Sequence, residues 1–381
     1  MDFDWTEEQL MFKQAIRDFT EKEIAPLVDE AEEKEEFPVE LFPKMGKLGY
    51  LAVGYPAEYD GGGMGSIGEC ILQEEVARVN CGIASALNAQ IALGTHIIYD
   101  HGTEEQKQKY LIPALKGEKI AAFAMTEPDA GSDLRGIQTT AAKDGDSYVL
   151  NGSKIFTSNG PIADFICVLA YTDKEKGTRG GQSVFIVEKG TPGFKVLRTL
   201  KKLGIRSEGT GEEVFENCRV PAENLVGEEG RGFQYMFSSL NLTRIPAAAR
   251  ALGTAVAAYE AATDYAKDRQ QFGQPVVKFQ TINFKLVNVA MEIEAARWMV
   301  YHAAWLNDQG QECTKEAAMA KLFTSNVAQH VTAEAMHIFG GYGLMMESPV
   351  QRYFRDARYF GIVVGTDEIN EMAIAWGIGV Y

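Results

Sequence analysis

Three stretches of the chain combine residue types that could hold a polar or phosphate-bearing ligand. Residues 124–133 read Ala-Met-Thr-Glu-Pro-Asp-Ala-Gly-Ser-Asp, and the hydroxyls of Thr126 and Ser132 with the free amides around Gly131 could form a concave polar site. Residues 269–273 read Arg-Gln-Gln-Phe-Gly, where an arginine and amide side chains at a helix end could hold a pyrophosphate or an adenine. Residues 339–343 read Phe-Gly-Gly-Tyr-Gly, and paired glycines let a flat or anionic ligand approach the backbone.

Each stretch also has an ordinary structural explanation. The first could be a turn rich in Asp, Gly and Ser, the second a helix C-cap ended by Gly273 and Pro275, and the third a plain helix stop. The chain contains neither GxGxxG nor GxxxxGK[ST], so the sequence supports neither a dinucleotide Rossmann site nor a P-loop. Its five cysteines form no CxxC pair and its five histidines no HxxxH pair, so no metal site is predicted.

The first stretch needs strands to position it. Residues 137–142 and 147–150 are β-like runs, and Asp144-Gly145 and Asn151-Gly152 are the dipeptides that two-residue hairpin turns favour. Residues 124–159 therefore predict a β-meander. Further β-like runs at residues 165–171, 183–188 and 213–220 predict that the sheet continues.

The regions on either side have helical periodicity. Before the strands we expect helices at residues 6–31, 42–51, 67–79, 83–100 and 103–115, with capping-box spacing at Thr6/Gln9 and Thr103/Gln106. After the strands we expect a bundle of helices at residues 232–268, 279–308, 313–338 and 366–378. The predicted fold is α+β: an N-terminal helical domain (1–119), a central β-domain (120–231) and a C-terminal four-helix bundle (232–381).

Composition excludes several classes of function. The chain has 381 residues, is 46% hydrophobic and 24% charged, and carries a formal net charge of -16, which argues against nucleic acid as a partner. No apolar run reaches about 18 residues, so no membrane span is expected. The acidic N-terminus lacks a signal-peptide pattern. An odd number of unclustered cysteines predicts reduced thiols and a cytoplasmic compartment.

Taken together and in order, these motifs resemble the acyl-CoA dehydrogenase family over nearly the whole chain. The similar stretches are residues 124–133, Asn-Gly-Ser-Lys-Ile-Phe-Thr-Ser-Asn at 151–159, 269–280, 339–343, 348–357, and Gly-Thr-Asp-Glu-Ile-Asn at 365–370. The resemblance implies the three-domain fold above and an FAD held between two subunits of a homotetramer, a dimer of dimers. It also implies an acyl-CoA thioester lying against the flavin and an electron-transferring flavoprotein as the electron partner.

The resemblance also implies site residues, position by position. Around the flavin ring it places Phe123, Met125, Thr126, Phe156 and Ser158, with Phe156 where many relatives have Trp, and it adds Thr366 and Glu368 facing the flavin. From the neighbouring subunit it assigns FAD contacts to Arg269, Gln271, Phe272, Gln280, Gly340 and Gly341. Ser132 falls among the cofactor contacts and also, with Asn241, Arg244 and Gly365, among the residues that bind the CoA substrate. The Arg244 guanidinium suits phosphate or other polar groups of CoA.

The catalytic base of the family is missing from its usual place. Relatives remove the α-proton with a glutamate in Tyr-Glu-Gly-Thr, but this chain reads Val363-Val364-Gly365-Thr366, and a valine cannot accept a proton. Some relatives carry the glutamate before the CoA-binding arginine, and here that residue is Thr243, a poor base. The base is therefore unidentified, and its loss typically costs about 10²–10⁴-fold in rate.

Several explanations stay open. The base could act on a different carbon, as in relatives that make cyclic dienes from cyclohexene-carboxyl-CoA by 1,4-elimination. The residues to inspect are then the polar ones of the helix at 83–96, Asn88, Gln90 and His96, none of which is a carboxylate. Alternatively the protein reduces an activated enoyl-CoA, cleaves a substituent without net redox chemistry as a lyase, or is a weakly active paralogue. We favour the first, with an alicyclic or otherwise unusual acyl-CoA.

A second departure concerns the charge of the acyl group. Glutaryl-CoA dehydrogenases carry an arginine at the place that Ala84 occupies here. A dicarboxylate end would then lack a bidentate partner, and burying it unpaired costs several kcal/mol. The sequence therefore predicts an uncharged acyl group.

Overall fold

The N-terminal region is built from short helices joined end to end in the computed structural model, which describes residues 5–381. The capping box at Thr6 forms, since Thr6 Oγ1 accepts Gln9 N–H at 3.2 Å and Gln9 Oε1 accepts Thr6 N–H at 3.0 Å. Helix α1 (Glu7–Phe19) continues through a π-helical turn and a 3₁₀ turn at Pro26 into α2 (Val28–Lys34). The region ends with α3 (Leu41–Lys47), α4 (Gly65–Val79), α5 (Cys81–Asn88), a π-helical segment (Ala89–Gly94), α6 (His96–His101), α7 (Glu104–Gln106) and α8 (Ile112–Leu115).

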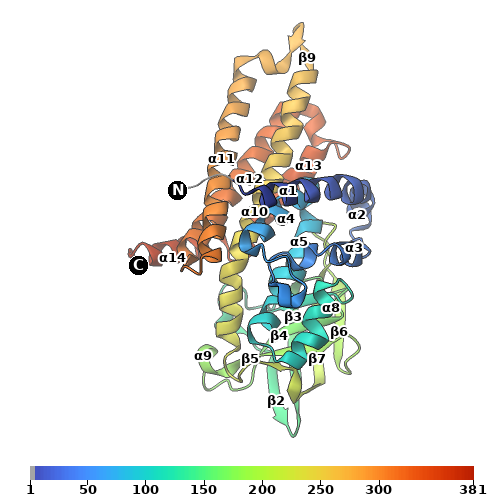
Figure 1. Ribbon diagram of the computed structural model, residues 1–381, viewed down its shortest axis with the longest axis vertical. Coiled ribbons are helices and arrows are strands. Elements are labelled where there is room, and N and C mark those ends of the chain that lie inside the picture. Colours follow the sequence, from blue (N-terminus) through green and yellow to red (C-terminus); the bar gives the residue numbers. More distant parts are fainter. Residues whose placement is uncertain (1–4) are drawn as a thin grey trace.

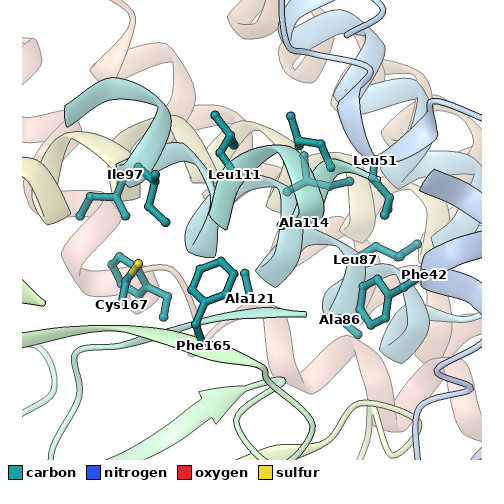
Figure 2. Packing of buried hydrophobic residues seen from close by; sticks show 14 of the residues in the cluster. Phe42, Leu51, Ala86, Leu87, Ile97, Leu111, Ala114, Ala121, Phe165 and Cys167 are labelled. Carbon is teal, nitrogen blue, oxygen red and sulfur yellow. The ribbon is translucent and has the colours of Figure 1, made fainter. Parts of the chain in front are cut away.

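The segment Cys81–His101 is the buried centre of this region. It is long and apolar enough to cross a membrane by length and hydropathy, but 89% of the apolar window is buried inside the fold. Ile83, Leu87, Ile97 and Ile98 on it contribute to the largest hydrophobic cluster. Figure 2 shows that cluster, in which Phe42, Leu51 and Leu111 from other helices meet Phe165 and Cys167 from the sheet. The helices therefore bury their apolar faces directly on the strands.

The central region is an eight-stranded sheet with strand order β6-β7-β3-β2-β4-β5-β8, and β1 pairs in parallel with β4. Its strands are β1 (Ala121–Ala124), β2 (Thr140–Asp144), β3 (Ser147–Ser158), β4 (Phe165–Tyr171), β5 (Gln182–Glu188), β6 (Phe194–Thr199), β7 (Thr210–Pro221) and β8 (Leu225–Val226). A short helix, α9 (Thr178–Gly181), lies in the β4–β5 connection. A hairpin does join β2 to β3, but Asp144 pairs with Ser147, so the two turn residues are Gly145 and Asp146, one residue later than predicted.

The second predicted hairpin turn is wrong. Asn151-Gly152 lies inside the continuous strand β3, at a register shift between Leu150 and Gly152 against β7. Asn151 Oδ1 accepts the Asn217 N–H of the neighbouring strand at 2.8 Å, so the side chain satisfies a bulge instead of closing a turn. The predicted meander is also incomplete, because β1 pairs with β4 and not with β2.

The C-terminal region is helical and includes the longest helix, α10 (Gly232–Asp268), which starts at the sheet and ends at the far tip of the molecule. A small hairpin (β9, Gln270–Gln271; β10, Gln274–Pro275) joins it to α11 (Gln280–Asp308), and α12 (Thr314–Phe339) returns alongside (Figure 1). Helix α13 (Pro349–Phe360), which the sequence analysis did not predict, packs on α10 and α12, and α14 (Asp367–Gly377) packs on α12. The chain thus has helical, β and helical regions in order, as expected, while the division at 119/120 and 231/232 stays a prediction.

Candidate active site

The first motif is clamped to strand β3 by main-chain and buried side-chain contacts. Ile155 N–H donates to Thr126 O at 2.9 Å, and Lys154 Nζ donates to Met125 O at 3.0 Å. Lys154, which has no exposed side-chain surface, also pairs with Glu127 at 2.8 Å. The sequence analysis quoted Lys154 within a motif but assigned it no role. The structure shows that it ties together two stretches that the resemblance placed around one ligand.

Phe156 owes its orientation to a bulge. The β3–β7 register shifts between Ile155 and Thr157, and Phe156 has φ 61° with 64% of its surface exposed. Bulges next to active sites often re-aim a side chain, and a bulky residue at positive φ is a backbone outlier. Ser158 follows on the same strand and is half-buried, and Phe123 and Met125 come from β1 and the segment after it. Ser132 is exposed in the adjacent loop.

The second and third motifs meet at the other end of α10. A cavity of about 440 Å³ is lined by Arg269 and Gln271 from one stretch and by Phe339, Gly340 and Gly341 from the other. Gly340 has φ +61°, and a Cβ added to Gly340 or Gly341 would meet no atom within 4 Å. The Arg269 guanidinium lies 5.7 Å from the centre of the Tyr342 ring, a neighbour that the sequence analysis missed. The Arg269 cation and the Gln271 amide are donors suited to a pyrophosphate, and the glycines leave room beside them, although the Gly340 N–H itself donates to the last turn of α12.

The hairpin beside this cavity presents an aromatic side chain to solvent. Phe272 is 93% exposed and adopts φ 51°, and Gln280 begins α11 nearby with an exposed side chain. Figure 1 shows this tip, labelled β9, well apart from the sheet that carries the first motif. One chain therefore brings Arg269, Gln271, Gly340 and Gly341 together but does not bring them to Phe156 and Ser158.

The loop at residues 363–366 is fixed by two buried polar residues that sequence reasoning missed. Lys321 Nζ donates to Gly365 O at 2.9 Å and lies 3.3 Å from Asp367 Oδ1, and Asn370 Nδ2 donates to Gly365 O at 2.9 Å. Burial lowers the pKa of Lys321, and Asp367 opposes that shift. Val364 adopts φ 54°, and a β-branched residue is a genuine outlier there. Such strain persists where the surrounding structure dictates it, as at functional sites.

Thr366 and Glu368 stand at the start of α14. Thr366 is its N-cap, with Oγ1 accepting Ile369 N–H at 3.4 Å, and Glu368 lies exposed in the first turn. Thr366 and the backbone at the helix start lower the pKa of Glu368. The first-turn donors of α14 are taken up locally, since Asp367 N–H donates to Gly361 O at 3.1 Å and Ile369 N–H donates to Thr366.

On α10, the residues expected to bind CoA are buried and partly pre-positioned. Arg244 is 5% exposed, and its Nη1 donates to Asn241 Oδ1 at 2.5 Å. Its Nε has no hydrogen-bond partner among the described residues, and burial lowers its pKa. The neighbouring Thr243 hydroxyl donates to Ser239 O at 2.7 Å and lies 3.4 Å from Ala92 O. A neutral hydroxyl is far less basic than a carboxylate, and no described group is hydrogen-bonded to Thr243 to take its proton except main-chain carbonyls, so Thr243 is not poised as a base.

Two of the three polar residues inspected on the predicted helix at 83–96, Gln90 and His96, have structural partners. Asn88 is buried, and Gln90 uses its amide to join Ala114 O, Lys119 O and Ala121 N–H. His96 Nε2 lies 3.4 Å from Glu69, a carboxylate on α4 that the sequence analysis did not consider. Hydrogen bonding to Glu69 raises the His96 pKa although burial alone would lower it.

The order of helical, β and helical regions, with a strained loop at Val364 and a cavity lined by Arg269 and Gln271, is that of a flavoenzyme of the acyl-thioester oxidoreductase class. Three family descriptions match in order: acyl-CoA dehydrogenase N-terminal domain (residues 6–118), middle domain (122–218) and C-terminal domain (230–379). The chain belongs to the acyl-CoA dehydrogenase family. It is an FAD-dependent oxidoreductase, as members of this family are flavoproteins.

Similar proteins cover the chain almost completely. The short-chain specific acyl-CoA dehydrogenase of Clostridium acetobutylicum is 45% identical over 98% of this chain and 99% of its own length. The acryloyl-CoA reductase (NADH) of Anaerotignum propionicum is 42% identical over 98% of this chain and 95% of its own. A chain of the structure described as "Electron transferring flavoprotein of Acidaminococcus fermentans" superposes with a TM-score of 0.97 at 44% identity, covering 99% of each chain.

FAD fits the residues present, because the cavity at Arg269 and Gln271 supplies donors for its phosphates and Phe156 an exposed ring face. When bound, FAD accepts the electrons removed from an acyl group, or returns them to an unsaturated one. The protein's own residues would have to hold the thioester, a role that the resemblance assigns to Arg244 and Gly365, and would have to move the proton. Neither Val364 nor Thr243 can do so.

Proposed function

We propose that this enzyme acts on an acyl-CoA with an alicyclic or otherwise unusual acyl group. In this substrate the reacting proton is not taken from the usual carbon. The observation that carries the proposal is the loop at Val364: its left-handed backbone and its Lys321 anchor are in place, but the side chain has no proton acceptor. The second position for a base, Thr243, is occupied by carbonyl contacts. Ala84 supports an uncharged acyl group, because a small apolar side chain stands where an arginine would be needed to pair with a second carboxylate.

We propose that the residues named from the resemblance bind FAD and the CoA substrate, and that the FAD is shared between two subunits. The separation of Phe156 and Ser158 from the cavity at Arg269 and Gly340 supports it, because one chain does not assemble the set. An apolar stripe on one face of α11, which a partner subunit would cover, supports a homotetramer: Phe284, Val287, Met291 and Trp305 are each at least 46% exposed. A tightly flavinylated monomer in solution would rule the shared site out.

Electron transfer and location are proposed on separate grounds. A very similar chain in a structure of an electron-transferring flavoprotein supports such a flavoprotein as the electron partner. All five cysteines are free and buried, which supports a reducing, cytoplasmic compartment.

Reduction of an enoyl-CoA is the second candidate. The similarity to an acryloyl-CoA reductase supports it, since a reductase adds a proton and can take it from solvent. A non-redox lyase on the same scaffold is the remaining alternative, because fold does not fix function.

Anaerobic bleaching of the flavin absorbance separates these candidates. The purified holoenzyme is mixed with butyryl-, cyclohexanecarboxyl- and cyclohexene-carboxyl-CoA, and the reduced enzyme with an enoyl-CoA. Bleaching by an alicyclic thioester but not by butyryl-CoA is expected. Rapid bleaching by butyryl-CoA would refute the missing-base argument. Reoxidation by the enoyl-CoA without bleaching by any saturated thioester would favour the reductase, and no redox change with any ligand the lyase.

A further inference from the structure

A buried arginine lies on the same face of α10 as Thr243, two turns along the helix. Arg250 is 1% exposed, and its Nε and Nη1 have no hydrogen-bond partner among the described residues. Seven residues advance a helix by about 10 Å and return it to nearly the same face. Between them lies Ala247, which is 2% exposed and has only a methyl side chain. An acyl group entering past Thr243 along this face would therefore point toward Arg250.

Two further elements connect the neighbourhood of Thr243 and Val364, the near end, with that of Arg250, the far end. On the facing segment, Ala92 O is next to the Thr243 hydroxyl, and Ser85 lies seven residues earlier on α5, which packs on α10. On the third element, Tyr359 near the end of α13 precedes Val364 by five residues. Ser85 Oγ and Tyr359 OH are hydrogen-bonded at 3.0 Å, which brings the far ends of these two elements together.

Arg250 belongs to this far end. Its charge acts on the Tyr359 hydroxyl and on the Cys81 thiol, in both cases opposing the rise in pKa that burial causes. Ser85 Oγ also donates to Glu208 Oε1 at 3.2 Å, and Glu208 lies 3.9 Å from Lys202. No carboxylate among the described residues is within 4 Å of Arg250. The far end is therefore a buried polar cluster in which the arginine donors are unmet.

What Arg250 lacks is an acceptor within reach. Asp356 Oδ2 on α13 is also buried without a hydrogen-bond partner, but among the described residues it forms no ion pair with Arg250. The hydroxyl proton of Ser85 is accepted by Glu208, and that of Tyr359 by Ser85. In contrast, the Nε and Nη1 groups of Arg250 have no acceptor among the described residues. An unpaired buried donor is costly, and a bound oxygen would relieve it. We propose that Arg250 is a specificity-determining residue that binds an oxygen at the distal end of the acyl group, an inference that rests on the proposed function. The oxygen comes from a hydroxyl, a ketone or a carboxylate.

Matched ligands test the inference by affinity for the oxidised holoenzyme, read from the perturbation of the flavin spectrum. The pairs are cyclohexanecarboxyl-CoA with its 4-hydroxy derivative, and hexanoyl-CoA with 6-hydroxyhexanoyl-CoA and adipoyl-CoA. At least one oxygen-bearing ligand should bind about 10- to 100-fold more tightly than its matched parent. In Arg250→Met that preference should disappear while the affinity for the parent stays within about threefold.

The alternative is that Arg250 serves only the fold, balanced by Glu208 across the cluster. Arg250→Met should then lower the melting temperature markedly, whereas an arginine without a partner is replaced by methionine with little loss or a gain. A marked loss of stability, or equal affinity for parent and oxygen-bearing ligands, would overturn the inference. Tyr359→Phe, which removes one hydroxyl and no charge, should keep most of the preference and guards against a folding failure in the first variant.

The affinities separate this inference from the proposed function. Oxygen-dependent binding without flavin bleaching by any ligand would contradict the proposed function alone. Bleaching by cyclohexene-carboxyl-CoA with no oxygen preference would contradict the Arg250 inference alone. A preference for adipoyl-CoA over the hydroxy ligand would support Arg250 and correct the expectation of an uncharged acyl group.

Discussion

Lys154 Nζ donates to Glu127 Oε1 at 2.8 Å inside the protein, with none of the Lys154 side chain exposed. The same ammonium donates to Met125 O, and the Glu127 carboxylate accepts the main-chain N–H groups of Gln138 and Thr139 at 2.6 and 3.0 Å. Burial lowers the pKa of Lys154 to about 8, and Lys154 in turn helps to lower the pKa of Glu127. This ion pair therefore holds the segment of Met125 and Thr126 against β3.

Lys154→Met should lower both stability and flavin content. Removing one partner of a buried pair costs about 3–5 kcal/mol, because the Glu127 charge is left uncompensated. The measurements are the urea midpoint and the ratio of flavin absorbance to protein absorbance. In the double variant Lys154→Met with Glu127→Gln, most of the stability should return. A single variant with unchanged flavin content would show that the clamp does not shape the flavin site.

Glu213 should give the protein a pH-dependent stability. Burial raises the pKa of Glu213 to about 7 although Thr157 Oγ1 donates to it at 2.6 Å. In the unfolded chain a glutamate has a pKa of about 4.3. The folded state therefore holds the proton more tightly, and the stabilisation is complete below about pH 4 and lost as pH rises to about 7. The shift corresponds to an upper limit of about 4 kcal/mol.

The test of that prediction is a series of urea unfolding curves between pH 5 and 8. Glu213→Gln stays neutral throughout, so its stability should fall less than that of the unmodified protein as the pH rises. Glu216→Gln on the same strand, whose side chain is exposed, is the matched control and should leave the slope unchanged. Parallel slopes for the Glu213 variant and the unmodified protein would contradict the prediction.

Lys321 should matter for binding through the loop that it holds. It is 2% exposed and donates to Gly365 O, so Lys321→Met removes one anchor of the loop beside Val364. A hydrogen bond from a charged donor is worth about 1.5–3 kcal/mol, and we expect acyl-CoA affinity to fall about tenfold or more. Lys315→Met, on the same helix and outside this contact, is the control. If titration gave equal dissociation constants for all three proteins, Asn370 alone would suffice to hold the loop.

The elements with strong local signals were predictable from the sequence. The 3.6-residue periodicity placed α10, α11 and α12 within one residue at each end, because helix signals are local. The capping box placed the start of α1, but the helix predicted at 6–31 is interrupted after Phe19 by the π-helical and 3₁₀ turns that lead into α2. Helix α13 carries a local signal as well, since Pro349 starts it and Val350, Ala357 and Phe360 recur at helical spacing on its buried face, and this signal was overlooked. The turn at Asn151-Gly152 failed because pairing with β7 imposes a bulge on a dipeptide that favours a turn elsewhere.

The missed site residues depend on tertiary contacts. In the sequence, nothing in the helical or strand periodicity marks Lys154, Lys321 or Arg250 as a site residue. Only the fold shows that each is buried. A signal was available for Lys321 and Arg250, which lie among apolar or alanine residues, where a charged residue is expected to be buried only with a function or a partner. The partners themselves could not be predicted from spacing. For Lys321, the partner Gly365 O lies 44 residues away along the chain.

Val364→Glu should introduce α,β-dehydrogenation that the unmodified protein lacks. The loop already has the left-handed backbone at this position, and an unbranched glutamate tolerates φ 54° better than a valine does, so the variant should fold at least as stably. A carboxylate there restores a general base, and bleaching by butyryl-CoA should rise about 10²–10⁴-fold. Val364→Gln has the same shape without the base and should gain the stability but not the rate. Equal rates for the two variants would show that the side chain acts by relieving strain, and a fast unmodified enzyme would show that a base exists elsewhere in the site.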